Sequence, residues 1–211
     1  MNVQQEKQPI YVTTGFLEKF AIVTADENVS FKDIGQMLVY QPYLVAHLLR
    51  EANRYCDEYG SSAKPKSIQG VINGLGLVRT ISECLAAQGI PEGEQSVFCA
   101  QTVDTYSLAI VLAELAEKRL GRKDTARDFF FVGLISPVVA QNSLILDSCH
   151  EELSQHYSGE IPRGHPTLLE ALELIGTFRK NPQADHGYIF TKWKSARERA
   201  REAIDEMAKF L

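Results

Sequence analysis

The sequence is poor in cysteine and holds no closely spaced cysteine pair. Among its 211 residues there are four cysteines and one tryptophan. The cysteines are Cys56, Cys84, Cys99 and Cys149. Because no two of them form a CxxC pair, neither a zinc knuckle nor a thioredoxin-like redox site is expected. Each lies in or beside an apolar stretch, so we expect reduced, partly buried thiols in a cytoplasmic protein.

Long hydrophobic runs are also absent. The most apolar run extends only from Phe129 to Ile135. This is far shorter than the ~20 apolar residues that a membrane helix needs. Residues 1–14 are polar and lack the apolar core of a signal peptide. We therefore expect a soluble, cytoplasmic protein with no membrane partner.

Positive charge is in short supply. The chain has 22 Lys and Arg against 27 Asp and Glu, which gives a formal net charge of -5. Binding to nucleic-acid phosphates needs a surplus of Lys and Arg, so a nucleic-acid partner is not expected. Hydrophobic residues make up 45% of the chain and charged residues 23%, which is typical of a globular protein. We predict a polar N-terminal tail over residues 1–14 and a single domain over residues 15–211.

Apolar residues recur at helical spacing along most of the chain. Ser30 and Asp33 form an acidic variant of a capping box before the first clear helix. Pro42 suits the first turn of the next helix. A longer helix is predicted from about Glu94 to Leu120. The last helix carries apolar residues every three or four positions, namely Ile189, Trp193, Ala196, Ala200, Ala203, Met207 and Leu211.

The shorter segments fit the same pattern. Ser67 can cap a helix that stops near Gly74 and Gly76. The helix after it is predicted to bury an apolar face made of Val78, Ile81, Leu85 and Ala86. The stretch from Phe129 to Ile135 is apolar all round, and we predict a helix there because no other segment would pair with a strand. The fold class predicted is all-α, a multi-helix bundle of two closely packed lobes, at about 15–92 and 93–211.

Two stretches of the chain resemble the HDOD family. Residues 40–53 read YQPYLVAHLLREAN and residues 67–80 read SIQGVINGLGLVRT. Family members carry similar xPxLxxxLLxxAN and SIxxAIxxLGxxR stretches at comparable separation. The matching residues are Pro42, Leu44, Leu48, Leu49, Ala52 and Asn53 in the first stretch, and Ser67, Ile68, Ile72, Leu75, Gly76 and Arg79 in the second. The resemblance implies a fold related to the HD phosphohydrolases and a role in bacterial signalling or gene regulation, usually without demonstrated catalysis.

The resemblance also implies where a metal site would lie. Family members often have a GLLHDIG-like segment there, whereas residues 133–139 of this chain read GLISPVV. Ser136 and Pro137 stand where His and Asp would be, and neither residue is a good metal ligand. The upstream ligand position falls on Asp104. We therefore expect no metal, no cofactor and no catalysis, with a cryptic hydrolase that uses Asp104, Asp128 and a loop histidine as an alternative.

None of the histidines is spaced like a metal-binding pair. His150 and His156 are six apart, which does not place them on one helical face. We expect each histidine to be a surface or capping residue. The five are His47, His150, His156, His165 and His186.

Three residues are candidates for ligand binding. Asn53 either fixes a helix junction by hydrogen bonds to backbone groups or contacts a ligand. Arg79 can bind a phosphate or carboxylate bidentately, with a surface ion pair as the alternative. Together with Asp104 they would line a remnant active-site cleft, which makes a nucleotide or cyclic-dinucleotide sensor the second functional hypothesis.

The last predicted helix is basic in its first half and acidic later, an order that runs against the helix dipole. A partner with an acidic surface would explain this order, and a solvated face with an Arg201–Asp205 pair is the alternative. Lys194, Arg197 and Arg201 are therefore the candidate partner-binding residues. The leading hypothesis is a noncatalytic regulatory module that binds a protein partner.

Overall fold

The computed structural model describes residues 10–60, 65, 67–120, 123–135 and 187–209, and these residues are almost entirely helical. They form eight α-helices, a short 3-10 helix and two strands of two residues. The helices are α1 (Phe16–Thr24), α2 (Phe31–Leu38), α3 (Pro42–Glu58), α4 (Ile68–Leu75), α5 (Leu77–Leu85), η1 (Glu92–Glu94), α6 (Gln95–Leu120), α7 (Lys123–Ile135) and α10 (Gly187–Ala208). The strands are β1 (Tyr11–Val12) and β2 (Gln88–Gly89), paired in parallel. The predicted all-α fold is confirmed.

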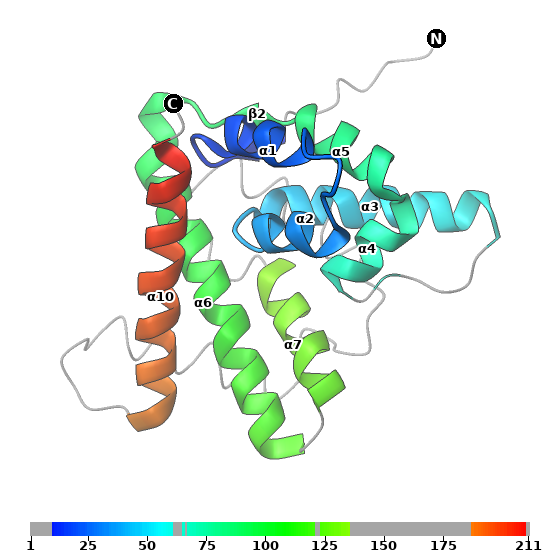
Figure 1. The fold of residues 1–211 in the computed structure, drawn as a ribbon. Helices are drawn as coiled ribbons and strands as arrows, with labels where there is room; N and C mark the ends of the chain where they lie inside the picture. Colours follow the sequence, from blue (N-terminus) through cyan, green and yellow to red (C-terminus); the bar gives the residue numbers. More distant parts are fainter. Residues whose placement is uncertain (1–9, 61–64, 66, 121–122, 136–186, 210–211) are drawn as a thin grey trace, which may run out of the picture.

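The helices fall into two groups in space. Helices α1 to α5 form one group, and α6 lies beside both α7 and α10 in the other (Figure 1). One hydrophobic core joins the groups, because Leu38, Leu48 and Ile72 of the first belong to the same cluster as Phe131 of α7 and Met207 of α10. Tyr106 of α6 adds a further connection.

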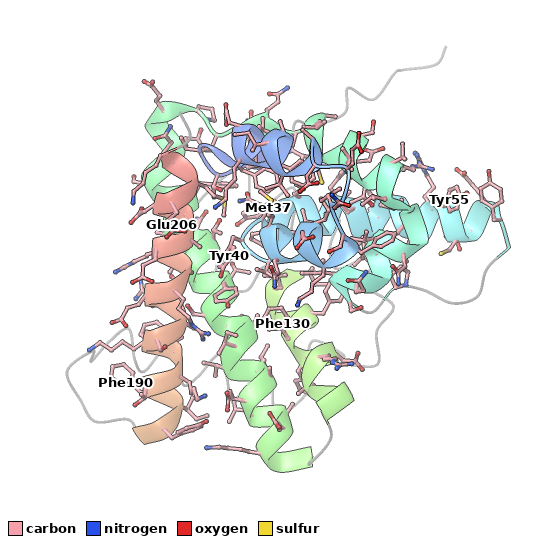
Figure 2. The ribbon with its side chains drawn as sticks, viewed as in Figure 1. Met37, Tyr40, Tyr55, Phe130, Phe190 and Glu206 are labelled. Carbon is pink, nitrogen blue, oxygen red and sulfur yellow. The ribbon has the colours of Figure 1, made fainter. Side chains whose placement is uncertain are left out.

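The aromatic contacts of Tyr106 cross from one group to the other. Its ring lies 5.0 Å from that of Tyr40, just after α2, and 6.2 Å from that of Phe130 on α7. Figure 2 labels Tyr40 and Phe130, the two aromatic partners of Tyr106. Burial is the main reason that the pKa of Tyr40 is raised to about 12. The Tyr40 hydroxyl therefore stays protonated at neutral pH.

Three helix starts follow the sequence signals closely. The Ser30 hydroxyl accepts a hydrogen bond from the Asp33 backbone N–H, and the Asp33 carboxylate accepts one from the Ser30 backbone N–H at 2.9 Å. The Asp33 carboxylate also accepts a hydrogen bond from the Ser30 hydroxyl at 2.6 Å, and this bond and the one from the Ser30 backbone N–H lower the pKa of Asp33. Pro42 occupies the first turn of α3, and the Ser67 hydroxyl accepts from the Gly70 N–H at 3.0 Å. The predicted caps and the predicted place of Pro42 are confirmed.

The N-terminal segment differs from the prediction. We expected a polar tail over residues 1–14, but Tyr11–Val12 pairs with Gln88–Gly89, and Val12 and Thr13 are buried. The Thr13 backbone N–H also donates to Gln41 Oε1 at 2.9 Å. Two residues are too short a strand to show an alternating pattern, so the pairing had no sequence signal. The prediction of a tail is wrong for residues 11–13.

Helix α5 buries a different face from the one predicted. Thr80 and Cys84 are buried, whereas Val78 is 83% exposed and Leu85 is 47% exposed. Thr80 can be buried because its hydroxyl donates to the Gly76 carbonyl at 2.8 Å, which satisfies the polar group within the helix. Burial raises the pKa of the Cys84 thiol to about 12, so the thiol stays protonated. The predicted apolar face with Val78 and Leu85 inward is wrong.

The other expectations for the helices hold where the structure describes them. Phe129 to Ile135 lies in α7, which confirms the predicted helix. Trp193, Ala196, Ala200 and Met207 are buried in α10, although Ile204 is buried where Ala203 was expected. Cys56, Cys84 and Cys99 are not joined in disulfides, and Cys149 lies outside the described residues.

One described helix is long and apolar enough to cross a membrane, judged by length and composition alone. It covers Glu92–Lys118, which includes η1 and most of α6. We expected no such segment because consecutive apolar runs are short. Uncharged polar residues interrupt those runs without adding charge, so the segment is still apolar on average over a length that could cross a membrane. Of that window, 56% is buried inside the structure, and a buried core helix passes the same test.

Candidate functional site

Three arginines surround one buried carboxylate where α3 and α5 meet. We call Arg50, Arg54 and Arg79, together with Glu51, the arginine cluster. The Glu51 side chain is 3% exposed, and its Oε2 lies 2.7 Å from Arg54 Nη2 and 3.6 Å from Arg79 Nη2. Its Oε1 lies 3.8 Å from Arg50 Nε. A carboxylate removed from water needs such positive partners, so the cluster holds α5 against α3.

The spacing along α3 explains the arrangement. Glu51, Tyr55 and Tyr59 follow one another at intervals of four residues, which places them in a row on one side of the helix. The Arg79 guanidinium crosses this row, 5.3 Å from the centre of the Tyr55 ring. The Tyr55 and Tyr59 rings are 4.3 Å apart. Figure 2 labels Tyr55 on the part of α3 that projects beyond the other helices.

His47 makes a second link between α3 and α5 beside the arginine cluster. Its Nε2 lies 3.0 Å from Glu83 Oε2, and its Nδ1 lies 2.8 Å from Arg50 Nη2. A guanidinium can only donate hydrogen bonds, so Nδ1 must accept and Nε2 must carry the proton that is donated to Glu83. We expected His47 at the surface or in a cap, and this is wrong because it is buried between α3 and α5.

The structure separates the three predicted ligand residues. Asp104 Oδ1 on α6 lies 3.4 Å from Arg197 Nε on α10, whereas Arg79 contacts α3 through Glu51. Within the described part of the chain, no contact joins Asp104 to Arg79. Asn53 is buried in α3, which leaves little of its side chain open to a ligand from solvent. A single site made of all three residues is not supported.

The predicted partner-binding residues also divide into two kinds. Lys194 and Arg201 are exposed on α10. Arg197 is instead half-buried, with its guanidinium 4.8 Å from the Trp193 ring and paired with Asp104. Arg197 therefore joins α10 to α6. The predicted Arg201–Asp205 pair is not formed among the described residues.

Within residues 10–60, 65, 67–120, 123–135 and 187–209, no three His, Cys, Asp or Glu side chains converge to hold an ion. Ser136, Pro137 and four of the five histidines lie outside these residues. The predicted loss of the metal site stays a prediction.

The sequence contains a signal for the buried Glu51 that our predictions did not include. Glu51 lies three residues after Leu48 and seven after Leu44, which places an acidic residue on the apolar face of α3. A charged residue on a buried face requires compensation. Four residues around it, Arg50, Arg54, Tyr55 and Tyr59, therefore belong to the site and were missed.

The fold and the site define an all-helical protein with a charged junction between two of its helices. Comparison of the chain with models of protein families, with curated proteins and with solved structures found no match. The resemblance to the HDOD family therefore rests on the sequence alone and stays a prediction.

We expect Glu51→Gln to lower the free energy of unfolding by about 1–3 kcal/mol, because a neutral amide no longer compensates the guanidiniums that approach it. The loss should stay below the one expected when a fully buried ion pair is broken, because the Arg54 side chain is 53% exposed. Urea denaturation followed by circular dichroism measures the change. Glu58→Gln, which removes an exposed acid that also pairs with Arg54, is the matched control and should cost far less. Equal losses in the two variants would show that burial of Glu51 is energetically unimportant.

Proposed function

We propose that this chain is a noncatalytic regulatory module that binds a protein partner through the outer face of α5. The observation that carries the proposal is the exposure of Val78 and Leu85 on that face. The two residues are seven apart, so they lie two turns apart on nearly the same side of the helix. Exposed apolar side chains that share a face are typical of interaction surfaces.

The core of the protein does not explain these apolar residues. Thr80 and Cys84 form the buried side of α5, so Val78 and Leu85 add little to the packing. A charged or polar residue at position 78 would suit solvent, and Lys or Glu would also favour the helix more than Val does. Recognition of a partner gives the exposed valine a role that folding does not.

The HDOD-like motifs support the same class of function. They imply bacterial signalling or gene regulation, usually without demonstrated catalysis, and the proposal extends to a cytoplasmic location. The nucleotide sensor that would use Asn53, Arg79 and Asp104 in one cleft finds less support, because Asp104 contacts α10 and Arg79 contacts α3. The cryptic hydrolase finds no observation in its favour among the described residues.

Pull-down from a native cell extract tests the proposal. Immobilised wild-type protein should retain a specific partner, and Val78→Glu should lose at least about tenfold of that capture because it places a charge on an apolar contact. Val97→Glu is the matched control, since Val97 is 50% exposed on a different helix, α6. Circular dichroism checks that both variants are folded. Capture of the same proteins by Val78→Glu and wild type would refute the docking face.

A further inference from the structure

Arg79 has unused capacity to donate hydrogen bonds. Its guanidinium carries five N–H donors, yet its contacts among the described residues are the ion pair with Glu51 at 3.6 Å and the ring of Tyr55. The ion pair is longer than a charge-assisted hydrogen bond, which spans about 2.7–2.9 Å. The Arg79 side chain is 33% exposed. Donors are therefore open to a ligand that approaches from solvent.

The open donors of Arg79 favour an anion. Glu51 is too deeply buried to meet a ligand, so its carboxylate acts as a positioning group that holds the guanidiniums of Arg54 and Arg79 near one point. Two guanidiniums that share one buried carboxylate leave an excess positive charge at the surface. Glu58, 3.7 Å from Arg54, is an exposed acid that offsets this one remaining charge, so the preference for an anion rests on the open donors of Arg79 and not on net charge. Glu83 is engaged by His47.

An aromatic surface lies next to these arginines. Tyr59 is 71% exposed, and its ring is tilted by 41° against that of Tyr55, with the ring centroids 4.3 Å apart. Because Tyr55 lies 5.3 Å from the Arg79 guanidinium and 4.3 Å from Tyr59, the distance from Arg79 to the Tyr59 ring is at most about 10 Å. This separation is comparable to that between the base and the phosphates of a nucleotide. Tyrosine rings are a common platform for bases.

We propose that the exposed side of the arginine cluster binds a nucleotide, with its phosphates on Arg54 and Arg79 and its base stacked on Tyr59. The ligand class follows from the two neighbouring chemistries, a paired guanidinium site for phosphate and an open aromatic face for a base. The proposal does not depend on the protein partner of α5. It also differs from a cleft shared with Asp104, which contacts another helix.

Titration of the full chain with ADP, pyrophosphate and adenosine, followed by isothermal calorimetry, tests phosphate binding and base binding separately. ADP is expected to bind about tenfold more tightly than pyrophosphate, because the base adds a stacking contact. Adenosine, which lacks phosphate, should show no binding at concentrations at which ADP saturates the protein. ADP binding should weaken as salt is raised.

Four substitutions complete the test. Arg79→Gln and Arg54→Gln should each weaken ADP and pyrophosphate about tenfold, since each removes a charge-assisted contact. Tyr59→Ala should weaken ADP to the affinity of pyrophosphate and leave pyrophosphate unchanged. Tyr59 is exposed, so this variant folds even if an arginine variant does not. Glu58→Gln removes a competing acid and should strengthen both ligands.

Several results would overturn the proposal. These are no binding of ADP at millimolar concentration, equal affinity for ADP and pyrophosphate, adenosine binding as tightly as ADP, or ADP binding that Tyr59→Ala does not weaken. Val78→Gln, a neutral polar change on the protein-binding face, should leave ADP binding unchanged because it adds no charge beside Arg79. Failure of one proposal is therefore distinguishable from failure of the other.

Discussion

Gly15→Ala is expected to produce the largest loss of stability of any single substitution considered for this protein. Gly15 has φ +74°, a conformation that costs an L-residue about 1–2 kcal/mol. A Cβ atom here would also overlap the Met207 carbonyl oxygen and lie 3.0 Å from the Ala208 Cα. These atoms belong to the backbone of α10, so no side-chain rotation relieves the overlap. We expect a total loss above about 3 kcal/mol.

The displacement of α10 in Gly15→Ala has a spectroscopic signature. Trp193 is the single tryptophan of the chain and is buried in α10. If α10 moves away from the start of α1, its fluorescence should shift to longer wavelength because the indole meets water. Urea denaturation followed by circular dichroism measures the stability loss in the same samples.

The matched control for Gly15→Ala is Gly60→Ala. Gly60 has φ +69°, almost the same backbone conformation, but a Cβ atom there meets nothing within 4 Å. Gly60→Ala should therefore lose only the conformational part, about 1–2 kcal/mol, with unchanged Trp193 fluorescence. Equal losses in the two variants would contradict a close approach between Gly15 and α10.

Gly133→Ala is expected to separate α6 from α7. A Cβ atom at Gly133 would lie 2.6 Å from the Ala109 Cα, 2.8 Å from Leu112 Cδ1 and 3.0 Å from the Ala109 backbone nitrogen. Leu112 can adjust its side chain, but Ala109 presents backbone. The helices must therefore move apart, at a cost of about 1–3 kcal/mol or more for overpacking. Thermal or urea denaturation measures the loss.

Gly35→Ala is the matched control for Gly133→Ala, because the same substitution should raise the stability of the protein there and not lower it. Gly35 also lies inside a helix, α2, but a Cβ atom there would be 3.8 Å from Ile72 Cδ1, an ordinary contact. Removing a helical glycine at such a position should stabilise the protein by about 0.5–1 kcal/mol. A Gly133→Ala variant as stable as wild type would show that α6 and α7 do not pack this closely.

Much of the helix pattern was predictable from local chemistry. Ser30 with Asp33, Pro42 and Ser67 act within their own turns, so their signals do not depend on the rest of the fold. Helix α1 was not identified, although its Phe16 and Phe20 are buried and stacked. Phe16, Leu17, Phe20 and Val23 follow helical spacing and all pack in or against the core, so the signal was present and our prediction missed it.

The candidate site was predicted residue by residue but not as an arrangement. Arg79 was predicted either to bind an anion or to form an ion pair, and the structure shows an ion pair, with the buried Glu51. Asp104 and Arg197 were assigned to different kinds of site, yet the structure pairs them. Spacing along one helix indicates which residues share a face. It does not indicate which residue of another helix lies opposite.

The sequence by itself determined that this protein is helical and where most of its helices begin, because caps, proline and apolar periodicity act over a few residues. The tertiary structure decided which side of α5 faces inward, which arginines gather around Glu51, and where α1 meets α10. These features depend on contacts between residues far apart in the chain, such as Gly15 and Met207. Local propensity carries no information about the packing that brings such residues together.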